Sequence, residues 1–378
     1  MPAIAPSTSS VSPMATPPDS PSAAPASGPD AQPHLVIPFA ACLGDEWQQV
    51  MKQLPPARLQ NLASLLKGMK LVSTNSGDAM SLSPPHERVL AAVGGLPVAD
   101  GLIPWAALRA GELGLASAGQ AWSFVTPCHW DVGRESATLV DPAALALTEA
   151  ESRTLLAAMQ SYFDSDGIRL HYLSPTQWLA EGDWLRDLPT ASLDRVIGRA
   201  ADPWLPGAAA SAGAADINIT GAPPREAAGG ARGAHTPAPK SAAATLRRLQ
   251  NEMQMLLYTH PLNDDRSARR QWPVNSIWFS GTGTLAAPAA PPANLQVSRS
   301  LADAALAGNW RAYADAWTAL DAGALAALLA QQRAGRSVRI TLCGERSALT
   351  YESASPGLAA RLLGLFKSPQ VLPVLEQL

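Results

Sequence analysis

The sequence is poor in the features that define several protein classes. Its 378 residues include only three cysteines, Cys42, Cys128 and Cys343, which are too few and too far apart for a disulfide framework or a thiolate zinc site. No apolar run approaches the roughly 18 residues that would cross a bilayer, and the first residues lack the charged and apolar segments of a signal peptide. We therefore expect a cytoplasmic protein without a membrane partner.

A strong excess of one charge is also missing. The 28 Lys and Arg residues against 31 Asp and Glu residues give a net charge of −3, so there is no basic footprint for non-specific nucleic-acid binding. Walker A and G-x-S-x-G motifs are absent. The segment "GTGTLA" at 281–286 fits G-x-G-x-x-A, but Ala and Pro follow it where a dinucleotide site needs a helix N-terminus. Single-stranded nucleic acid stays open as a weaker partner, because eleven tryptophans could supply stacking surfaces.

Two stretches contain few large apolar residues. Residues 1–32 are almost entirely Pro, Ala, Ser and Thr, and residues 207–243 are rich in Gly, Ala and Pro. Neither buries enough apolar surface to offset the entropy of ordering, which predicts a disordered tail and a low-complexity linker or surface loop. The remaining ranges, 33–206 and 244–378, are interpreted as the N-terminal and C-terminal halves of one core.

Hydrophobic periodicity predicts helices and hairpins in alternation. Thr148 and Glu151 match a capping box at the start of one helix. Interleaved helices and hairpins predict a mixed α/β (α+β) fold, in which helices cover a mixed sheet. Helices are expected within 45–69, where Pro55-Pro56 separates two of them, and within 84–93, 104–113, 148–163, 300–320 and 322–335. Hairpins are expected within 121–142, 167–185 and 337–352.

The densest polar stretch is "LRRLQNEMQMLLYTHPLNDDRSARRQWPVNSIWFSGTG", residues 246–283. It predicts a helix capped by Thr245, a turn and a buried strand. Arginines at 266, 269 and 270 can bind a phosphate or carboxylate bidentately, or they pair with Asp264 and Asp265 in a solvated turn; both interpretations stand here. No catalytic residue is assigned, and the candidate ligand- or partner-binding residues are Arg247, Asn251, His260, Asn263, Arg266, Arg269, Arg270, Asn275 and Ser280.

Metal binding has one weak candidate pair. His129 and Asp131 alternate in "CHWD", so both could reach one ion. A pair is short of the three or four ligands that a stable site needs. We expect a hydrogen-bonded or half-buried His129 and no metal or other cofactor.

The 246–283 stretch, with "WSFVTPCHWDVG", "FDSDGIRLHY" and "LPTASLDRVIG", resembles the bacterial RpfE-type regulatory proteins. Some members carry the label cofactor-independent phosphoglycerate mutase. The resemblance spans about 34–206 and 244–378. It implies a regulatory role and, in some members, a chromosomal position beside a single-strand exonuclease, but it supplies no catalytic residues.

Two segments of the sequence resemble motifs of the phosphoglycerate mutases. "VNSIWFSGTG" resembles the N-x-I-W-x-W-G-x-G segment of archaeal-type phosphoglycerate mutases, and Asp100-Gly101 resembles their first metal-binding Asp-Gly. That resemblance implies a degenerate alkaline-phosphatase-like core. The family's D-x-x-x-H and G-H ligand motifs are absent, and Ser280 replaces the second Trp. Without metals to neutralise the phosphate, we expect shared ancestry without mutase turnover.

Two main hypotheses follow for the function. The first is a non-catalytic regulatory or interaction protein that binds an unknown protein partner or a small anionic ligand. The alternative is a phosphate-ester enzyme related to phosphoglycerate mutases, which would need a divalent metal.

Overall fold

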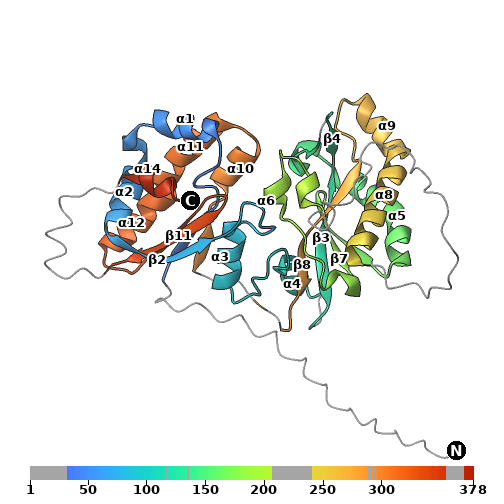
Figure 1. Ribbon diagram of the computed structural model, residues 1–378, viewed down its shortest axis with the longest axis horizontal. Helices are drawn as coiled ribbons and strands as arrows, with labels where there is room; N and C mark the ends of the chain where they lie inside the picture. The colour runs from blue at the N-terminus through green and yellow to red at the C-terminus, as the bar shows by residue number, and fades with distance from the viewer. Residues whose placement is uncertain are drawn as a thin grey trace, which may run out of the picture. The chain divides into compact units, whose positions relative to one another are not determined.

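The structure, a computed structural model, describes residues 32–115, 118–134, 136–206, 241–287, 289, 292, 294–354 and 370–378. The strands there form a five-stranded sheet, a four-stranded sheet and a two-stranded hairpin. We call the elements around the first sheet lobe 1 and those around the second lobe 2 (Figure 1). The expected mixed α/β fold is confirmed. The predicted tail and linker lie, apart from residues 32 and 241–243, outside the described residues.

The five-stranded sheet is mixed and has the order β2-β11-β10-β1-β9. β1 runs parallel to both β9 and β10, whereas β11 is antiparallel to β10 and β2. Its alternating side chains face two apolar clusters, with Leu35 and Ile37 in one and Val36 in the other. The strands are β1 His34–Ile37, β2 Met69–Ser76, β9 Leu295–Val297, β10 Arg339–Cys343 and β11 Ser347–Ser353.

Helices cover both faces of this sheet. Most pack on the Leu35 side, where Tyr313 and Trp317 of α11 are fully buried. α3 packs on the other side through Val89. The elements are α1 Asp45–Gln53, the 3-10 helix η1 Pro56–Leu59, α2 Gln60–Lys67, α3 Pro85–Val93, α10 Ser300–Leu306, α11 Trp310–Leu320, the π-helical turn η5 Asp321–Leu325, α12 Ala326–Arg333 and α14 Val371–Leu375.

Lobe 2 contains the antiparallel sheet β6-β7-β3-β8. α5 and α8 cover one face with Phe163 and Leu249, and α4 covers the other, against Trp122. The strands are β3 Ala121–Cys128, β4 Trp130–Val132, β5 Ala137–Leu139, β6 Arg169–Ser174, β7 Gln177–Glu181 and β8 Ser276–Thr284. The helices are α4 Trp105–Glu112, η2 Pro142–Leu145, α5 Glu149–Ser165, η3 Asp183–Leu185, α6 Leu193–Val196, η4 Asp202–Trp204, α8 Ala242–Tyr258 and α9 Pro261–Ala268.

Lobe 2 is an insertion within lobe 1. The chain forms β1, β2 and α3, then builds lobe 2, and returns to lobe 1 at β9. Each sheet therefore combines strands from both of the halves read from the sequence: β1 pairs with β10, and β3 pairs with β8.

The local predictions have a mixed outcome. The Thr148–Glu151 capping box and the β6–β7 and β10–β11 hairpins are confirmed. The predicted N-cap of α8, Thr245, was wrong. Ser241, one turn earlier in the chain, is the N-cap of that helix. The hairpin in 121–142 is limited to β4 and β5, because β3 pairs with β7 and β8 instead.

Candidate functional site

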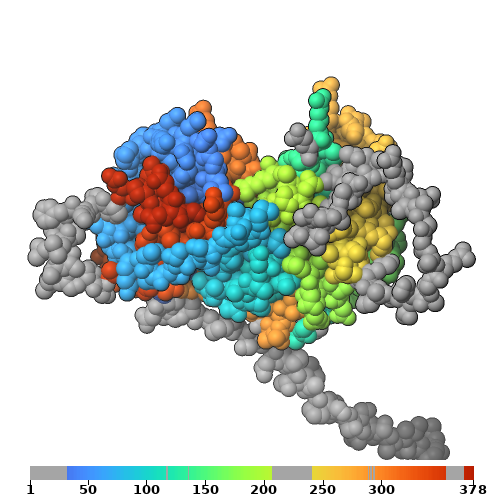
Figure 2. Space-filling model, in the orientation of Figure 1, coloured from blue at the N-terminus to red at the C-terminus, as the bar shows by residue number. Residues whose placement is uncertain are grey.

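The parallel strands of lobe 1 end at a polar cluster between the lobes. Phe39, Arg299 and Glu345 follow the carboxyl ends of β1, β9 and β10. In α/β sheets this edge is where ligands usually bind. α3 and α6 meet there in Figure 1, and Figure 2 shows the surfaces of these two segments in contact. The candidate site therefore lies at this edge of the sheet.

The first residue at this edge, Phe39, has an unusual backbone. Its φ is 54°, in the left-handed region that non-glycine residues rarely adopt. The Tyr313 hydroxyl lies 2.8 Å from the Phe39 carbonyl oxygen, to which it can donate, and accepts from Trp47 Nε1 at 3.1 Å. This buried network fixes the turn after β1 and places the Phe39 ring 5.9 Å from the ring of His86.

Asp194 joins the two lobes. Its carboxylate lies 2.9 Å from His86 Nε2 and accepts two bonds from the Arg299 guanidinium, at 2.9 and 3.0 Å. Burial alone would raise the pKa of Asp194, but the hydrogen bonds and charges of His86 and Arg299 hold that pKa well below its usual range. Both oxygens of the Asp194 carboxylate are therefore occupied by basic groups of lobe 1.

A second carboxylate, Glu87, lies beside this pair. Its two oxygens accept from the Ser192 hydroxyl at 2.5 Å and from Trp105 Nε1 at 3.2 Å. Burial raises the pKa of Glu87, partly opposed by His86 and these hydrogen bonds. α3 thus contacts lobe 2 through two consecutive polar side chains.

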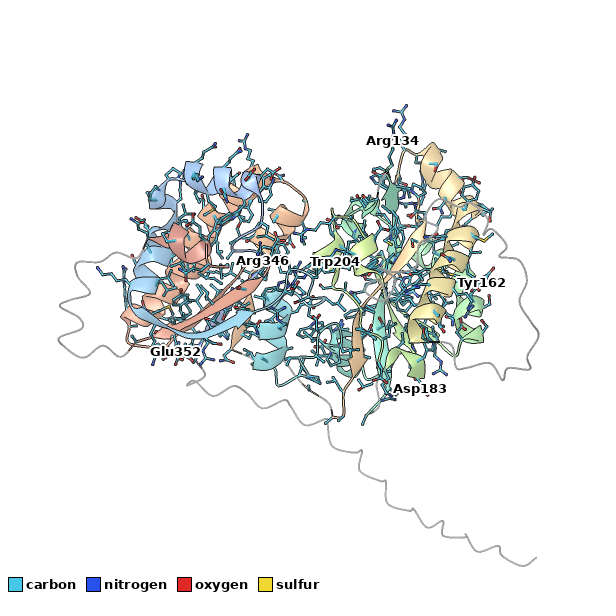
Figure 3. The ribbon with its side chains drawn as sticks, viewed as in Figure 1. Arg134, Tyr162, Asp183, Trp204, Arg346 and Glu352 are labelled. Atoms are coloured by element: carbon cyan, nitrogen blue, oxygen red, sulfur yellow. The ribbon has the colours of Figure 1, made fainter. Side chains whose placement is uncertain are left out.

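Glu345 and Arg195 form the other part of the cluster. The Glu345 carboxylate pairs with Arg199 at 2.6 Å and accepts from the Leu43 backbone N–H at 2.9 Å. Arg195 Nη1 donates to the Glu345 carbonyl at 2.8 Å, and its guanidinium lies 5.8 Å from the centre of the Trp204 ring. Figure 3 places Trp204 and Arg346 at this junction. Burial lowers the pKa of Arg195 to about 10, and the nearby charge of Arg88 adds to this effect.

The carboxylates of the cluster are all engaged by protein groups. Asp194 and Glu345 pair with arginines, and Glu87 accepts from Ser192 and Trp105. Asp100, which resembled a metal ligand in the sequence, accepts the backbone N–H groups of residues 82 and 83. Among the described residues, no group of three or more His, Cys, Asp or Glu could hold a metal ion.

Of the three arginines predicted to bind an anion at α9, Arg266 has a structural role. Arg266 is fully buried. It donates to Glu151 at 3.0 Å, to the Trp272 carbonyl at 2.9 Å and to the Leu145 carbonyl. All three guanidinium nitrogens of Arg266 donate to protein groups, so the prediction that Arg266 is available to an anionic ligand was wrong. The other prediction, an ion pair with Asp264 or Asp265, named the wrong acid, because Arg266 pairs with Glu151.

The candidate residues near Arg266 are either exposed to solvent or hydrogen-bonded to the protein. Arg269 is exposed and reaches Glu151 at 2.6 Å, and Arg270 is exposed with a φ of 58°. Asn263 is buried and donates to the Leu257 and Val274 carbonyls. His260 caps α9. Any ligand role for these residues stays a prediction.

The remaining candidates lie on α8 and at or in β8. The Asn275 side chain accepts from the Trp130 backbone N–H and donates to the Trp130 carbonyl, and Ser280 is buried in β8. Arg247 donates to the Pro206 carbonyl, and Asn251 is exposed on the same helix, α8. A ligand role for these four residues stays a prediction.

His129 and Asp131 differ in burial and in their contacts. His129 Nδ1 lies 2.8 Å from the Pro273 carbonyl, and the His129 ring packs on Trp272. Asp131 is exposed on β4. Burial lowers the pKa of His129, against the effects of the Pro273 carbonyl and Asp131. The sequence predicted a hydrogen-bonded or half-buried His129, and in the structure His129 is hydrogen-bonded and only 9% exposed.

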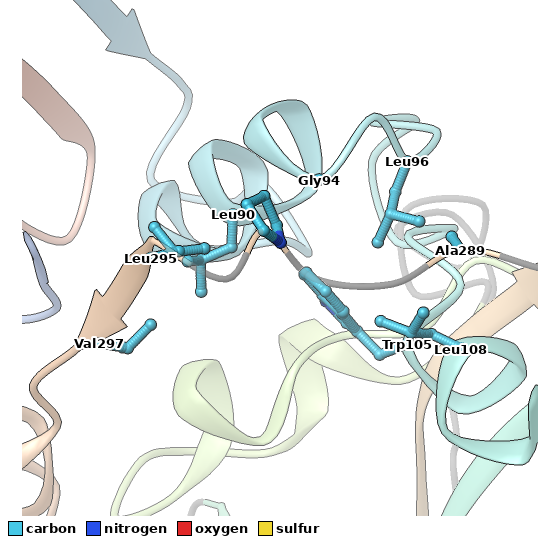
Figure 4. A pocket seen from close by; sticks show the side chains of 9 residues that line it. Leu90, Gly94, Leu96, Trp105, Leu108, Ala289, Leu295 and Val297 are labelled. Atoms are coloured by element: carbon cyan, nitrogen blue, oxygen red, sulfur yellow. The ribbon is translucent and has the colours of Figure 1, made fainter. Parts of the chain in front are cut away.

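An apolar pocket of about 210 Å³ lies near the cluster. Leu90 of α3, Trp105 and Leu108 of α4, and Leu295 and Val297 of β9 line it (Figure 4). It is smaller than the usual range of about 300–1,000 Å³ for small-molecule sites. Its wall shares Trp105 with the Glu87 contact.

Comparisons with known proteins give distant structural similarities. No protein-family model and no curated protein matches this chain. A cofactor-independent phosphoglycerate mutase from Thermoplasma acidophilum is similar, with a TM-score of 0.31 and 14% identity over 92% of this chain and 99% of that one. The PH0037 protein from Pyrococcus horikoshii has a TM-score of 0.38 and 12% identity over 85% and 87%. The alkaline-phosphatase-like core therefore stays an expectation from the sequence.

Proposed function

We propose that this protein is a non-catalytic regulatory or interaction protein, as the RpfE resemblance implies, acting in the cytoplasm on a small anionic ligand or a protein partner. The observation that carries the proposal is the state of the carboxylates at the carboxyl edge of β1, β9 and β10. Asp194 is saturated by His86 and Arg299, and Glu345 by Arg199 and a backbone N–H.

This arrangement is poorly suited to metal-assisted phosphate chemistry. A divalent metal needs oxygen or nitrogen ligands that are free to bind it, whereas freeing Asp194 would take from the buried His86 the acid with which it pairs and from Arg299 its two-bond partner. The cluster instead resembles a contact that holds two lobes in a defined arrangement. Such a contact suits a protein that acts by changing its conformation.

None of the described helices is long and apolar enough to span a membrane.

The test compares turnover with binding in the full chain. Purified protein is assayed on 3-phosphoglycerate and p-nitrophenyl phosphate with Mg²⁺, Mn²⁺ or Zn²⁺ added. We expect no saturable turnover with any metal. Metal-dependent turnover that co-purifies with the protein and is lost in Asp194→Asn would establish the enzyme alternative. Salt-sensitive binding of a labelled oligothymidylate would support the nucleic-acid alternative instead.

A further inference from the structure

The guanidinium of Arg195 is a buried polar group of the cluster with two nitrogens that lack hydrogen-bond partners among the described residues. Arg195 is only 2% exposed, yet neither Nε nor Nη2 has a hydrogen-bond partner among the described residues. Within that part of the chain only Nη1 donates, to the Glu345 carbonyl. Buried polar groups are nearly always satisfied, because leaving one unpaired costs about 1–3 kcal/mol and more for a charge. Two free donors on one buried cation therefore need a physical explanation.

The identity of the two free nitrogens is informative. Nε and Nη2 carry the parallel N–H groups that form the side-on fork of arginine, which binds a carboxylate or phosphate bidentately. Trp204 lies across the guanidinium, 5.8 Å from it, and limits its movement. The fork is thus held in place before any ligand arrives.

The nearby acids leave the fork of Arg195 unpaired. Arg88 and Arg199 act on Arg195 as nearby cations, and Asp100 and Glu345 act on it as nearby anions. The Asp100 carboxylate accepts the backbone N–H groups of residues 82 and 83, and the Glu345 carboxylate pairs with Arg199, so neither carboxylate is bonded to the fork. A carboxylate carries one negative charge, whereas a phosphate monoester brings about two.

We propose that the Arg195 fork binds the carboxylate of a small molecule between the two lobes. This inference rests on the proposed non-catalytic function and names its ligand class. Arg195 belongs to α6 of lobe 2, and it is anchored on Glu345 of lobe 1. Because the fork is covered in this structure, a ligand enters when the lobes separate and then stabilises their closed arrangement.

The experiment titrates full-length protein with benzoate and with acetate at constant ionic strength, using calorimetry and the thermal unfolding midpoint. Inorganic phosphate is titrated in parallel. Arg195→Lys keeps the charge but removes the fork, and Arg311→Lys, at an exposed position of α11, is the matched control. We expect carboxylate binding to weaken at least ten-fold in Arg195→Lys and to stay unchanged in Arg311→Lys.

Three results would overturn the proposal: no carboxylate binding by the wild type, equal affinity in Arg195→Lys, or tighter binding of phosphate than of carboxylates. Should Arg195→Lys fail to fold, hydrogen exchange of the wild type decides. Benzoate should then slow exchange of the 192–199 amides, and unchanged exchange counts against the site. The phosphate-ester assay is independent, so either proposal can fail without the other.

Discussion

Nε2 of His86 lies 2.9 Å from Oδ2 of Asp194, although the two residues belong to different lobes. Arg299 binds the same carboxylate from the lobe 1 side. One buried acid of lobe 2 thus receives two basic groups of lobe 1. The contact between the lobes depends on charge as well as on shape.

The first prediction concerns this acid. Asp194→Asn removes the negative charge and should lower the free energy of unfolding by about 3 kcal/mol, because the buried His86 loses its acid and Arg299 loses the stronger of its two acidic partners. Urea denaturation measures the change. Asp303→Asn is the control: Asp303 also pairs with Arg299, at 3.4 Å, but it is exposed, so its loss should cost at most about 1 kcal/mol. Equal losses in both variants would show that Asp194 contributes no more than a surface acid.

The second prediction separates two arginines of the α9 region. Arg266→Ala should destabilise the protein by about 3 kcal/mol, since Glu151 loses its buried arginine partner and two buried backbone carbonyls lose their donor. Arg270→Ala, at an exposed position, should change stability by no more than about 0.5 kcal/mol. Thermal and urea unfolding of the two variants test this contrast. A stable Arg266→Ala protein would mean that Arg269 and Thr148 are sufficient partners for Glu151.

The third prediction concerns acid unfolding. Burial raises the pKa of Glu151, but the bonds from Thr148, Arg269 and Arg266 outweigh it and lower that pKa from 4.5 to about 2. A depressed pKa stabilises the folded state above the unfolded value of 4.5 and loses this contribution as the pH falls toward 2. Glu151→Gln should therefore be less stable at neutral pH and show a shallower decline across this window. Parallel pH profiles of the free energy of unfolding would contradict the assignment.

The fourth prediction uses two glycines with similar backbones. Gly101 has a φ of 73°, and a Cβ there would lie 2.6 Å from Leu82 Cδ1 and 3.0 Å from the Thr190 nitrogen. Gly335 has a φ of 84° and nothing within 4 Å. Gly335→Ala should cost about 1 kcal/mol of backbone strain, and Gly101→Ala should cost clearly more because of crowding between loops of the two lobes. Equal decreases of the thermal unfolding midpoint in Gly101→Ala and Gly335→Ala would mean that the loops around Gly101 move apart to accommodate the Cβ.

Local patterns in the sequence predicted local structure well. The Thr148 capping box and the 337–352 hairpin depend on neighbouring residues, so their signals are contained in a short window. β1 was missed because its four residues are buried on both sides, which removes the alternation of a half-exposed strand, and because its partners begin at Leu295 and Arg339.

The polar cluster was not predictable for a related reason. His86, Asp194 and Glu345 lie in three distant segments, and no spacing rule connects them. Their approach depends on how lobe 2 packs on α3 and on the carboxyl edge of lobe 1. The arginines of 266–270 gave the stronger sequence signal, yet Arg266 stabilises the fold through Glu151, an acid that the sequence placed only in a helix cap.

The insertion of lobe 2 into lobe 1 also has a consequence for synthesis on the ribosome. All strands of the four-stranded sheet lie between residues 121 and 284, so they can pair as soon as that segment has emerged. β1 and β2 emerge earlier, but β9, β10 and β11 are translated last. The first strands of the chain must therefore wait, with unpaired backbone and exposed apolar side chains, until almost the whole protein has been made. Nascent chains halted before residue 339 should bind chaperones through these strands, even when lobe 2 has already folded.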